Sequence, residues 1–421
     1  MPFFFKENGD SIWNKFLENA RLAIIANAAS NIFAFATVTI AARNMAVDDF
    51  AIYASFVSIV LVLSQVMDFG FTVATISNQK KLEKANKLDQ AIAAIFLVRI
   101  IFGALIALIV ILFSEEIEYF LFGEKVGVLN GLIFLFSIGI VNTLALKYQL
   151  ELRYFNYAKI LAGLAAARLF FVILSISIFD SSDLINIFVW SYMLTTIPIL
   201  LLHLPKLIDI FQYFYSIIGN LSHLLHGWVW PYLSLIFSVL IIRLDTYVIL
   251  IYQDLETAGR YTANLALVLL IPLVFNALYP LVMSTMNSLY IKHGIPYVLN
   301  KFHSICFKLL PIVVVCIFLS SYLPSIFFGE DYVLSSGSFE IMVSGFLIGV
   351  YVNLLSTSLY YTGQEKFLSL ALLIQLVAHG ILSFTYVPIY GILGAVCSAF
   401  VARFIGLIVV MFHVKLIMVK K

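Results

Sequence analysis

The stretch IFFGEDY, residues 326–332, interrupts a chain that otherwise consists largely of long apolar runs. A near copy, YFLFGEK, occupies residues 119–125, so the tripeptide FGE occurs twice at an offset of 206 positions. Each copy ends one apolar run and precedes another. Glycine in such a place is typical of a helix C-terminal stop. This repeated motif between apolar runs predicts that the chain consists of two similar halves.

The composition indicates that the solvent of this chain is a lipid bilayer. Of its 421 residues, 62% are hydrophobic and 11% are charged, and the mean hydropathy is +1.04. Soluble domains are about half apolar and about a quarter charged. The apolar runs approach the roughly 20 residues that a helix needs to cross a membrane, and they lack the alternation of an outer-membrane barrel. We therefore predict an all-α polytopic membrane protein with about twelve transmembrane helices. The predicted spans are 19–42, 50–78, 90–113, 127–146, 159–179, 184–204, 226–252, 262–288, 304–325, 337–360, 367–387 and 391–414.

The orientation follows from lysine and arginine in the short loops, which favour the cytoplasmic side. With the N-terminus inside, seventeen basic residues fall in the inner loops and tails, and three fall in the outer loops. The inner ones are Lys6, Lys15, Lys80, Lys81, Lys84, Lys87, Lys147, Arg153, Lys159, Lys206, Lys292, Lys301, Lys308, Lys366, Lys415, Lys420 and Lys421. The outer ones are Arg43, Lys125 and Arg260. We predict that both termini are cytoplasmic, and the net charge of +2 gives no reason to expect a nucleic-acid partner.

A second echo supports the division into halves. MAVDDFAIYA (45–54) follows the first predicted span and DLETAGRYT (254–262) follows the seventh, with Tyr53 and Tyr261 208 positions apart. We predict two six-helix lobes that are parallel repeats, a design that places the substrate path between the halves. The predicted domains are an N-terminal lobe (1–204), a cytoplasmic linker with an interfacial helix (205–226) and a C-terminal lobe with a short basic tail (227–421).

Several motifs together resemble those of a known transporter family. LSQVMDFGFTVATIS (63–77) and ARNMAVDDFAIYA (42–54) resemble the second helix and the first outer loop of prokaryotic polysaccharide flippases. IIRLDTYVILIYQDLETAGRYTANLAL (241–267) and YGILGAVCSAF (390–400) resemble their seventh helix with the following loop and their last helix. The chain is similar to the Wzx-type flippases of the multidrug/oligosaccharidyl-lipid/polysaccharide exporter superfamily.

This resemblance implies both a fold and a substrate. The fold would be a V-shaped, two-lobed transporter like the multidrug-and-toxin extruders, and the protein would be located in the bacterial inner membrane. The substrate would be an undecaprenyl-pyrophosphate-linked oligosaccharide, moved to the outer leaflet for surface polysaccharide such as O-antigen lipopolysaccharide. Membrane lipid and other polysaccharide-assembly proteins would be its partners. No cofactor is expected, although transport could be coupled to an H+ or Na+ gradient.

Ionisable residues within predicted spans are the main site candidates, because such groups are costly in a bilayer. Arginine forks suit phosphate oxygens, so we predict that Arg168, Arg243, Arg403 and Arg99 line a cavity for the pyrophosphate. The alternatives are snorkelling for Arg99 and interhelical pairing for Arg168 and Arg403. Asn31 is a candidate for contact with the sugar, or equally for a helix–helix hydrogen bond.

Two carboxylates are candidates for binding a coupling ion. Asp68 shares a helical face with Thr72, and Asp245 lies two residues from Arg243, so that the two point in nearly opposite directions. A structural ion pair is the alternative role for Asp245, and the cytoplasmic interface is the alternative place for Asp68.

No catalytic residue and no metal site is predicted. The chain has no nucleotide-binding loop, no paired metal-ligating histidines and no nucleophile elbow. The three cysteines, Cys306, Cys316 and Cys397, lack metal-type spacing and are expected to be buried small side chains. A multidrug/cation antiporter of the same fold and an integral-membrane glycan polymerase remain as alternatives. The sugar, the coupling ion and the oligomeric state are not specified by the sequence.

Overall fold

The computed structural model is helical throughout the part that it describes. The described residues are 9–72, 75, 82, 87–114, 128–151, 153–178, 184–203, 229–272, 317–318, 320–335, 337–361 and 364–420. No strand occurs among them. The linker at 205–226, both predicted lobe boundaries and the first FGE copy lie outside these residues, so the predictions about them stay predictions.

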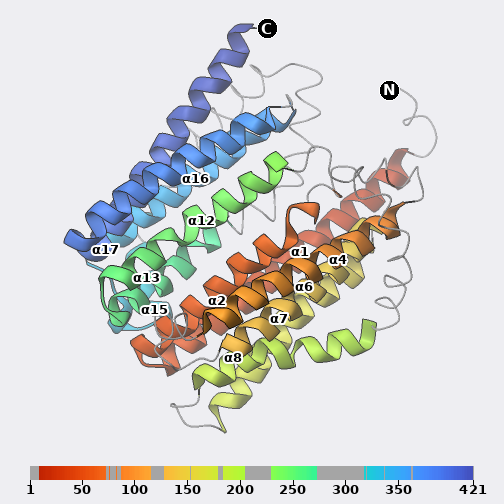
Figure 1. Ribbon diagram of the computed structural model, residues 1–421, viewed down its shortest axis with the longest axis horizontal. Helices are drawn as coiled ribbons and strands as arrows, with labels where there is room; N and C mark the ends of the chain where they lie inside the picture. The colour runs from red at the N-terminus through yellow and green to blue at the C-terminus, as the bar shows by residue number, and fades with distance from the viewer. Residues whose placement is uncertain are drawn as a thin grey trace.

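The helices form two groups that lie side by side (Figure 1). We call the first group the N-lobe and the second the C-lobe. The N-lobe contains α1 (Gly9–Asn44), α2 (Val47–Asp68), α4 (Leu88–Leu112), α6 (Val128–Leu150), α7 (Tyr154–Ile176) and α8 (Leu184–Leu194). The C-lobe contains α12 (Val229–Tyr252), α13 (Leu255–Val268), α15 (Leu323–Phe327), the short 3-10 helix η3 (Glu330–Tyr332), α16 (Ser338–Tyr361) and α17 (Glu365–Lys420).

The helices have the length and composition of membrane spans. Eight of those in the described part are long and apolar enough to cross a bilayer. The longest, α17, includes both of the last two predicted spans, because the chain reverses at Gly391 (φ 55°), just after Pro388. The prediction of an all-α polytopic membrane protein is therefore confirmed.

Two predicted boundaries were wrong in an informative way. The second span was expected to continue to residue 78, but α2 ends at Asp68, because Phe69 (φ 49°) and Gly70 (φ 73°) adopt left-handed backbone conformations. The eighth span was expected to begin at 262, but α13 begins at Leu255, where the Asp254 side chain accepts a hydrogen bond from the Thr257 amide. DLETAGRYT is thus the start of a helix rather than a loop.

The lobes meet through the two helices that carry the second sequence echo. Tyr53 of α2 and Tyr261 of α13 are both fully buried. A Cβ atom on Gly259 would come within 2.4 Å of the Val47 carbonyl oxygen, so α13 can approach the start of α2 this closely only with glycine there. Position 259 lies 208 residues after Ala51, which is also fully buried. Small residues at repeat-related positions therefore let the lobes pack tightly at this end.

Candidate inter-lobe binding site

Arg168 of α7 lies near the aromatic side chains of Tyr192 and Tyr53. Its guanidinium carbon is 3.5 Å from the ring centroid of Tyr192, which lies in the last turn of α8. The hydroxyl groups of Tyr53 and Tyr192 interact, and Arg168 is close enough to Tyr53 to affect it electrostatically. The Nε–H group of Arg168 has no hydrogen-bond partner in the described structure. This guanidinium is therefore stacked on a ring and keeps one donor unused within the described part of the chain.

Arg243 of α12 approaches the same tyrosine from the C-lobe. It lies close enough to Tyr247, Tyr261 and Tyr192 for electrostatic interaction with their hydroxyl groups. The Tyr247 hydroxyl is 3.4 Å from the Ser58 hydroxyl of α2, which joins the two lobes at this level. Among the described residues, neither Arg168 nor Arg243 forms an ion pair with a carboxylate. We call Arg168, Arg243, Tyr53, Tyr192 and Tyr247 the arginine–tyrosine site.

Both arginines lie near Tyr192. Arg168 stands 14 residues after Tyr154, which begins α7. A rise of 1.5 Å per residue places it about 21 Å from the start of that helix. A ligand between the lobes at this level could contact both guanidinium groups.

Arg99 occupies a different environment, inside the N-lobe. Its Nε and Nη2 atoms donate to Asp68 Oδ1 over 3.0 and 2.5 Å, and both side chains are buried. Nη1 donates to Thr143 Oγ1 (2.6 Å), and Thr72 Oγ1 donates to Asp68 Oδ1 (2.6 Å). The structure thus brings two predicted site residues, Arg99 and Asp68, together as a pair. Their charges compensate each other, and snorkelling of Arg99 is excluded by its burial.

Asp245 is the centre of a buried hydrogen-bond cluster within the C-lobe. Tyr261 donates to its Oδ2 over 2.9 Å, and Ser383 donates to Oδ1 over 2.9 Å. His379 Nε2 is 2.8 Å from Oδ1, and the imidazole is fully buried. Asp245, His379, Ser383 and Tyr261 therefore satisfy a carboxylate with hydroxyl groups and a titratable ring. We call them the Asp245 cluster.

Arg403 lies within the C-lobe, and Asn31 lies on α1 of the N-lobe. Arg403 is buried between α16 and α17, with its guanidinium 4.0 Å from the Phe346 ring and near enough to Asp245 for electrostatic attraction. It also lines a small C-lobe cavity of about 80 Å³ together with Gln375 and Asn353. Asn31 is half-buried on α1. The five substrate-binding candidates are therefore not gathered in one place.

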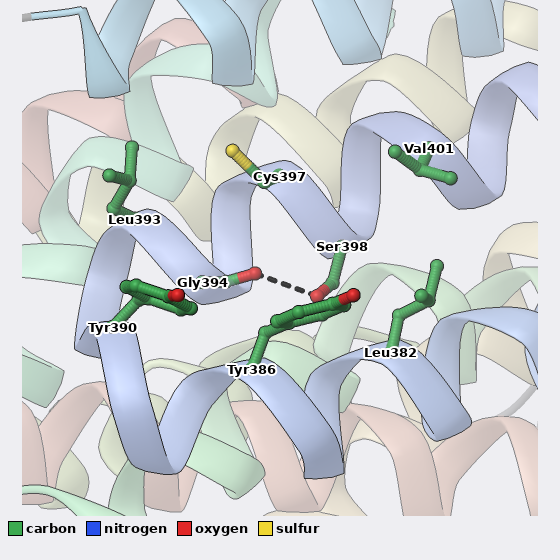
Figure 2. Close-up of a pocket in the computed structure, with 8 residues that line it drawn as sticks. All are labelled: Leu382, Tyr386, Tyr390, Leu393, Gly394, Cys397, Ser398 and Val401. Atoms are coloured by element: carbon green, nitrogen blue, oxygen red, sulfur yellow. Dashed lines mark hydrogen bonds between the residues drawn. The ribbon is translucent and has the colours of Figure 1, made fainter.

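An apolar groove lies on α17, outside the arginine–tyrosine site. It has a volume of about 450 Å³ and is formed where the two arms of α17 diverge from Gly391 (Figure 2). Tyr386 and Leu393 belong to its wall, and the Ser398 hydroxyl is used in a bond to the Gly394 carbonyl. No charged side chain lines the groove. Cys397 is exposed in it, so the expectation that this cysteine is buried was wrong.

The groups at the inter-lobe site are of a kind that could bind an anion. Two guanidinium groups without a carboxylate partner among the described residues, together with several phenol hydroxyl groups, offer hydrogen-bond donors, and guanidinium forks match phosphate geometry. The part of the chain that the structure describes contains no cluster of metal-ligating side chains. The aromatic rings give the site broad faces, and the surrounding spans place it within the membrane.

The described helices have the length and composition of a polytopic membrane protein. The chain is similar to a structure titled "Lipid II flippase MurJ, inward closed conformation", with a TM-score of 0.68, 16% identity and coverage of 94% of this chain and 87% of that one. It is also similar to an inward-facing MATE family multidrug resistance transporter of the MOP superfamily, with a TM-score of 0.65, 11% identity and coverage of 94% and 98%. These likenesses show that the chain has the fold of these transporters.

The family follows from the sequence itself. Residues 16–286, more than half of the chain, match the family model described as "Polysaccharide biosynthesis protein". The chain belongs to this family, as the sequence motifs predicted. No curated protein matches the chain.

Sequence reasoning missed several residues of these sites. Tyr192 and Tyr247 carry no signal, because nothing in one sequence shows which tyrosines of a tyrosine-rich membrane protein face the lobe interface. Tyr53 and Tyr261 were visible as a repeated pair, but only as evidence for the repeat. His379 was not among the predicted site residues, although its position four residues before Ser383 on one helix face was a usable signal.

Proposed function

We propose that this protein is a Wzx-type flippase that moves undecaprenyl-pyrophosphate-linked oligosaccharide units from the cytoplasmic to the outer leaflet of the bacterial inner membrane. The pyrophosphate binds between Arg168 and Arg243 while the lipid tail stays in the bilayer. Access to this site alternates between the two sides as the lobes move relative to each other. The proposed product serves surface polysaccharide assembly, and the oligosaccharide carrier lipid is the partner.

One observation carries this proposal. Guanidinium groups from opposite lobes lie near Tyr192, with no carboxylate partner among the described residues. An unpaired charge within a membrane is costly, so it is retained where a ligand of opposite charge uses it. A site with two cations also disfavours the cationic substrates of a drug antiporter. Membership of a polysaccharide biosynthesis family supports the same substrate class.

The other candidate residues have geometries that suit other roles. Arg99 is already balanced by Asp68, and Arg403 is enclosed within the C-lobe. We therefore assign the pyrophosphate to Arg168 and Arg243 alone. Asn31 is half-buried on α1, and we leave it as a candidate sugar contact.

For ion coupling, we favour Asp245 over Asp68. The Asp68 carboxylate faces a guanidinium that is always charged, so protonation or cation binding there would break a buried ion pair. Asp245 faces hydroxyl groups and the His379 imidazole, with Arg403 further away. A proton can therefore be taken up or released in the Asp245 cluster without breaking a hydrogen-bonded arginine–carboxylate pair. The proposed coupling ion is H+.

The experiment is complementation of a strain that lacks this gene. The deletion should remove the surface polysaccharide and leave the lipid-linked repeat unit on the cytoplasmic face of the membrane. Wild-type protein should restore the glycan, Arg243→Ala should not, and Arg243→Lys should restore only part of it, because lysine keeps the charge but not the fork. Protein levels are matched by immunoblot.

The matched control is Arg260→Ala, which removes an arginine that is exposed and paired with Glu256 one turn away. This variant should complement fully. An intact surface glycan in the deletion strain, together with new sensitivity to cationic dyes, would replace this proposal with the drug-antiporter alternative.

A further inference from the structure

The second FGE stretch reaches from the C-lobe to the N-lobe at the predicted outer end. This end contains the turn between α1 and α2 and residues 326–337. Arg43, next to last in α1, donates from Nε to the Phe327 carbonyl oxygen over 2.7 Å. Its Nη2 donates to the Ile326 carbonyl oxygen over 2.5 Å. Both carbonyl groups end α15, where a helix has no backbone donors left to satisfy them. One side chain of the N-lobe therefore caps a helix of the C-lobe.

A second bond joins the same two segments. The Tyr332 hydroxyl donates to the Ala42 carbonyl oxygen over 2.9 Å, and Tyr332 is buried. Burial and the nearby Asp331 carboxylate raise the pKa of this hydroxyl, so it stays protonated and remains a donor. On the C-lobe side, Asn264 of α13 donates to the Tyr332 backbone carbonyl over 2.8 Å. The stretch is thus anchored to its own lobe by Asn264 and bound to the other lobe through its ring.

Aromatic packing seals the contact between these bonds. The Tyr332 ring meets Phe50 of α2 edge to face, with centroids 5.7 Å apart. Phe327 and Phe328 pack edge to face against Phe35 of α1, with centroids 5.2 and 6.1 Å apart. Gly329, between the two helices α15 and η3, has φ 106° and ψ 171°, a conformation that is essentially restricted to glycine. The glycine of the FGE motif is therefore needed to aim the phenylalanines and the tyrosine at α1 and α2.

We propose that Arg43 and Tyr332 form a latch that holds the lobes together at the outer end, above the arginine–tyrosine site. The three hydrogen bonds of the latch each join a donor side chain to a backbone carbonyl. The latch can therefore open and close without exposing an unpaired buried carboxylate. Opening to the outside must break these bonds and separate Phe35 and Phe50 from Phe327, Phe328 and Tyr332. The transport role of the latch rests on the proposed function, whereas the latch itself is a property of the lobe interface.

The test is a distance measurement between the lobes. Cys306, Cys316 and Cys397 are replaced by serine, and spin labels are attached at Asp48→Cys in the N-lobe and Val333→Cys in the C-lobe, both exposed positions. Double electron–electron resonance is recorded on the purified full-length protein. The parent should show mainly the short distance of the closed outer end. Arg43→Gln should raise the ratio of long to short distances about tenfold, and Tyr332→Phe about fivefold, because they remove two charge-assisted bonds and one neutral bond.

Two further variants keep the outcome interpretable. Arg43→Lys keeps the charge without the two-donor fork, and it should give an intermediate ratio while retaining the parent's thermal stability. Arg260→Gln, the matched control at the same end, should leave the distribution unchanged. Distributions for Arg43→Gln and Tyr332→Phe that superimpose on the parent's would overturn the latch. Failure of glycan complementation alone would overturn the proposed function but not the latch, because the distance measurement needs no substrate.

Discussion

The two lobes treat a buried aspartate in opposite ways. In the N-lobe, Asp68 is paired with Arg99, whose remaining donors are used by Thr143 and by the Gly139 carbonyl. In the C-lobe, Asp245 accepts from two hydroxyl groups and lies against His379. The first arrangement pairs two opposite charges, whereas the second surrounds a carboxylate with hydroxyl groups and an imidazole. The two lobes therefore satisfy a buried carboxylate by different chemistry.

The buried arginines also differ in whether they have a partner of opposite charge. Arg99 has an acid partner within its own lobe, whereas Arg168 and Arg243 both lie near the ring of Tyr192. A guanidinium that already has its counter-ion contributes to the fold. One that lacks a counter-ion among its neighbours is available to a ligand. The presence of a partner, and not the depth in the membrane, separates these roles.

The largest expected effect comes from breaking the N-lobe pair. Asp68→Ala leaves the Arg99 guanidinium buried and uncompensated, which should lower the stability by about 3–5 kcal/mol. Thermal unfolding of the purified protein in detergent measures the loss. The double variant Asp68→Ala/Arg99→Met, which removes both charges, should regain most of it. A double variant as unstable as Asp68→Ala would mean that packing, rather than the lone charge, causes the loss.

Replacing the inter-lobe arginines should affect ligand binding rather than stability. Arg168→Gln or Arg243→Gln should change the melting temperature little, because no ion pair is broken. Each should weaken binding of a pyrophosphate lipid by roughly tenfold or more, the effect of losing charge-assisted hydrogen bonds worth about 1.5–3 kcal/mol. Equilibrium binding of undecaprenyl pyrophosphate measures this, with Arg260→Gln as control. A large loss of stability without a loss of affinity would place these arginines with Arg99.

Within the Asp245 cluster, the role of His379 can be separated from its packing. His379→Phe removes a hydrogen bond to a carboxylate and should cost roughly 1.5–3 kcal/mol of stability. His379→Gln keeps a donor of similar reach, so it should retain most of that stability, but its amide cannot take up a proton as an imidazole can. Under the proposed H+ coupling, transport by the wild type should depend on pH, and transport by His379→Gln should not. Identical pH profiles for the two proteins would remove H+ coupling from this cluster.

The smallest effect concerns the starts of the repeat-related helices. Asp254 caps α13, whereas Ala46 precedes α2 with no side-chain cap. Asp254→Ala should cost about 1 kcal/mol. Hydrogen bonds from the Thr257 side chain and amide lower the pKa of Asp254, so its contribution is fully present above the unfolded-state pKa. The contribution is lost as the pH falls through the lower folded-state pKa.

Two matched variants test this cap. Asp254→Asn keeps a capping oxygen that does not titrate, so its stability should lack that acid-dependent loss. Ala46→Asp should stabilise α2 by a similar small amount. Equal acid sensitivity of the wild type and Asp254→Asn would show that another group is responsible.

Much of the fold could be predicted from the sequence, because long apolar runs can only be satisfied as helices in a bilayer. The break after Asp68 could not, since a phenylalanine with positive φ has no sequence signal and is held by its packing against Phe102 and Tyr232. The candidate arginines were visible as charges within spans. Which of them has an acid partner could not be predicted. The Asp68–Arg99 contact joins residues 31 apart, and it depends on how each helix is rotated in the bundle.

The latch is the clearest case of a site that the sequence shows without explaining. The FGE repeat and Arg43 were both apparent, one as a repeat and the other as a rare basic residue on the outer side. Their contact spans 283 and 284 positions. Only the three-dimensional arrangement shows that one binds the other.

The most direct test of the central claim is binding of undecaprenyl pyrophosphate to the purified protein, compared with undecaprenyl phosphate, by native mass spectrometry. The wild type should prefer the pyrophosphate lipid, and Arg168→Gln/Arg243→Gln should lose that preference while remaining folded. Equal binding of both lipids by the wild type, or an unchanged preference in the double variant, would contradict the assignment of the pyrophosphate to these two arginines.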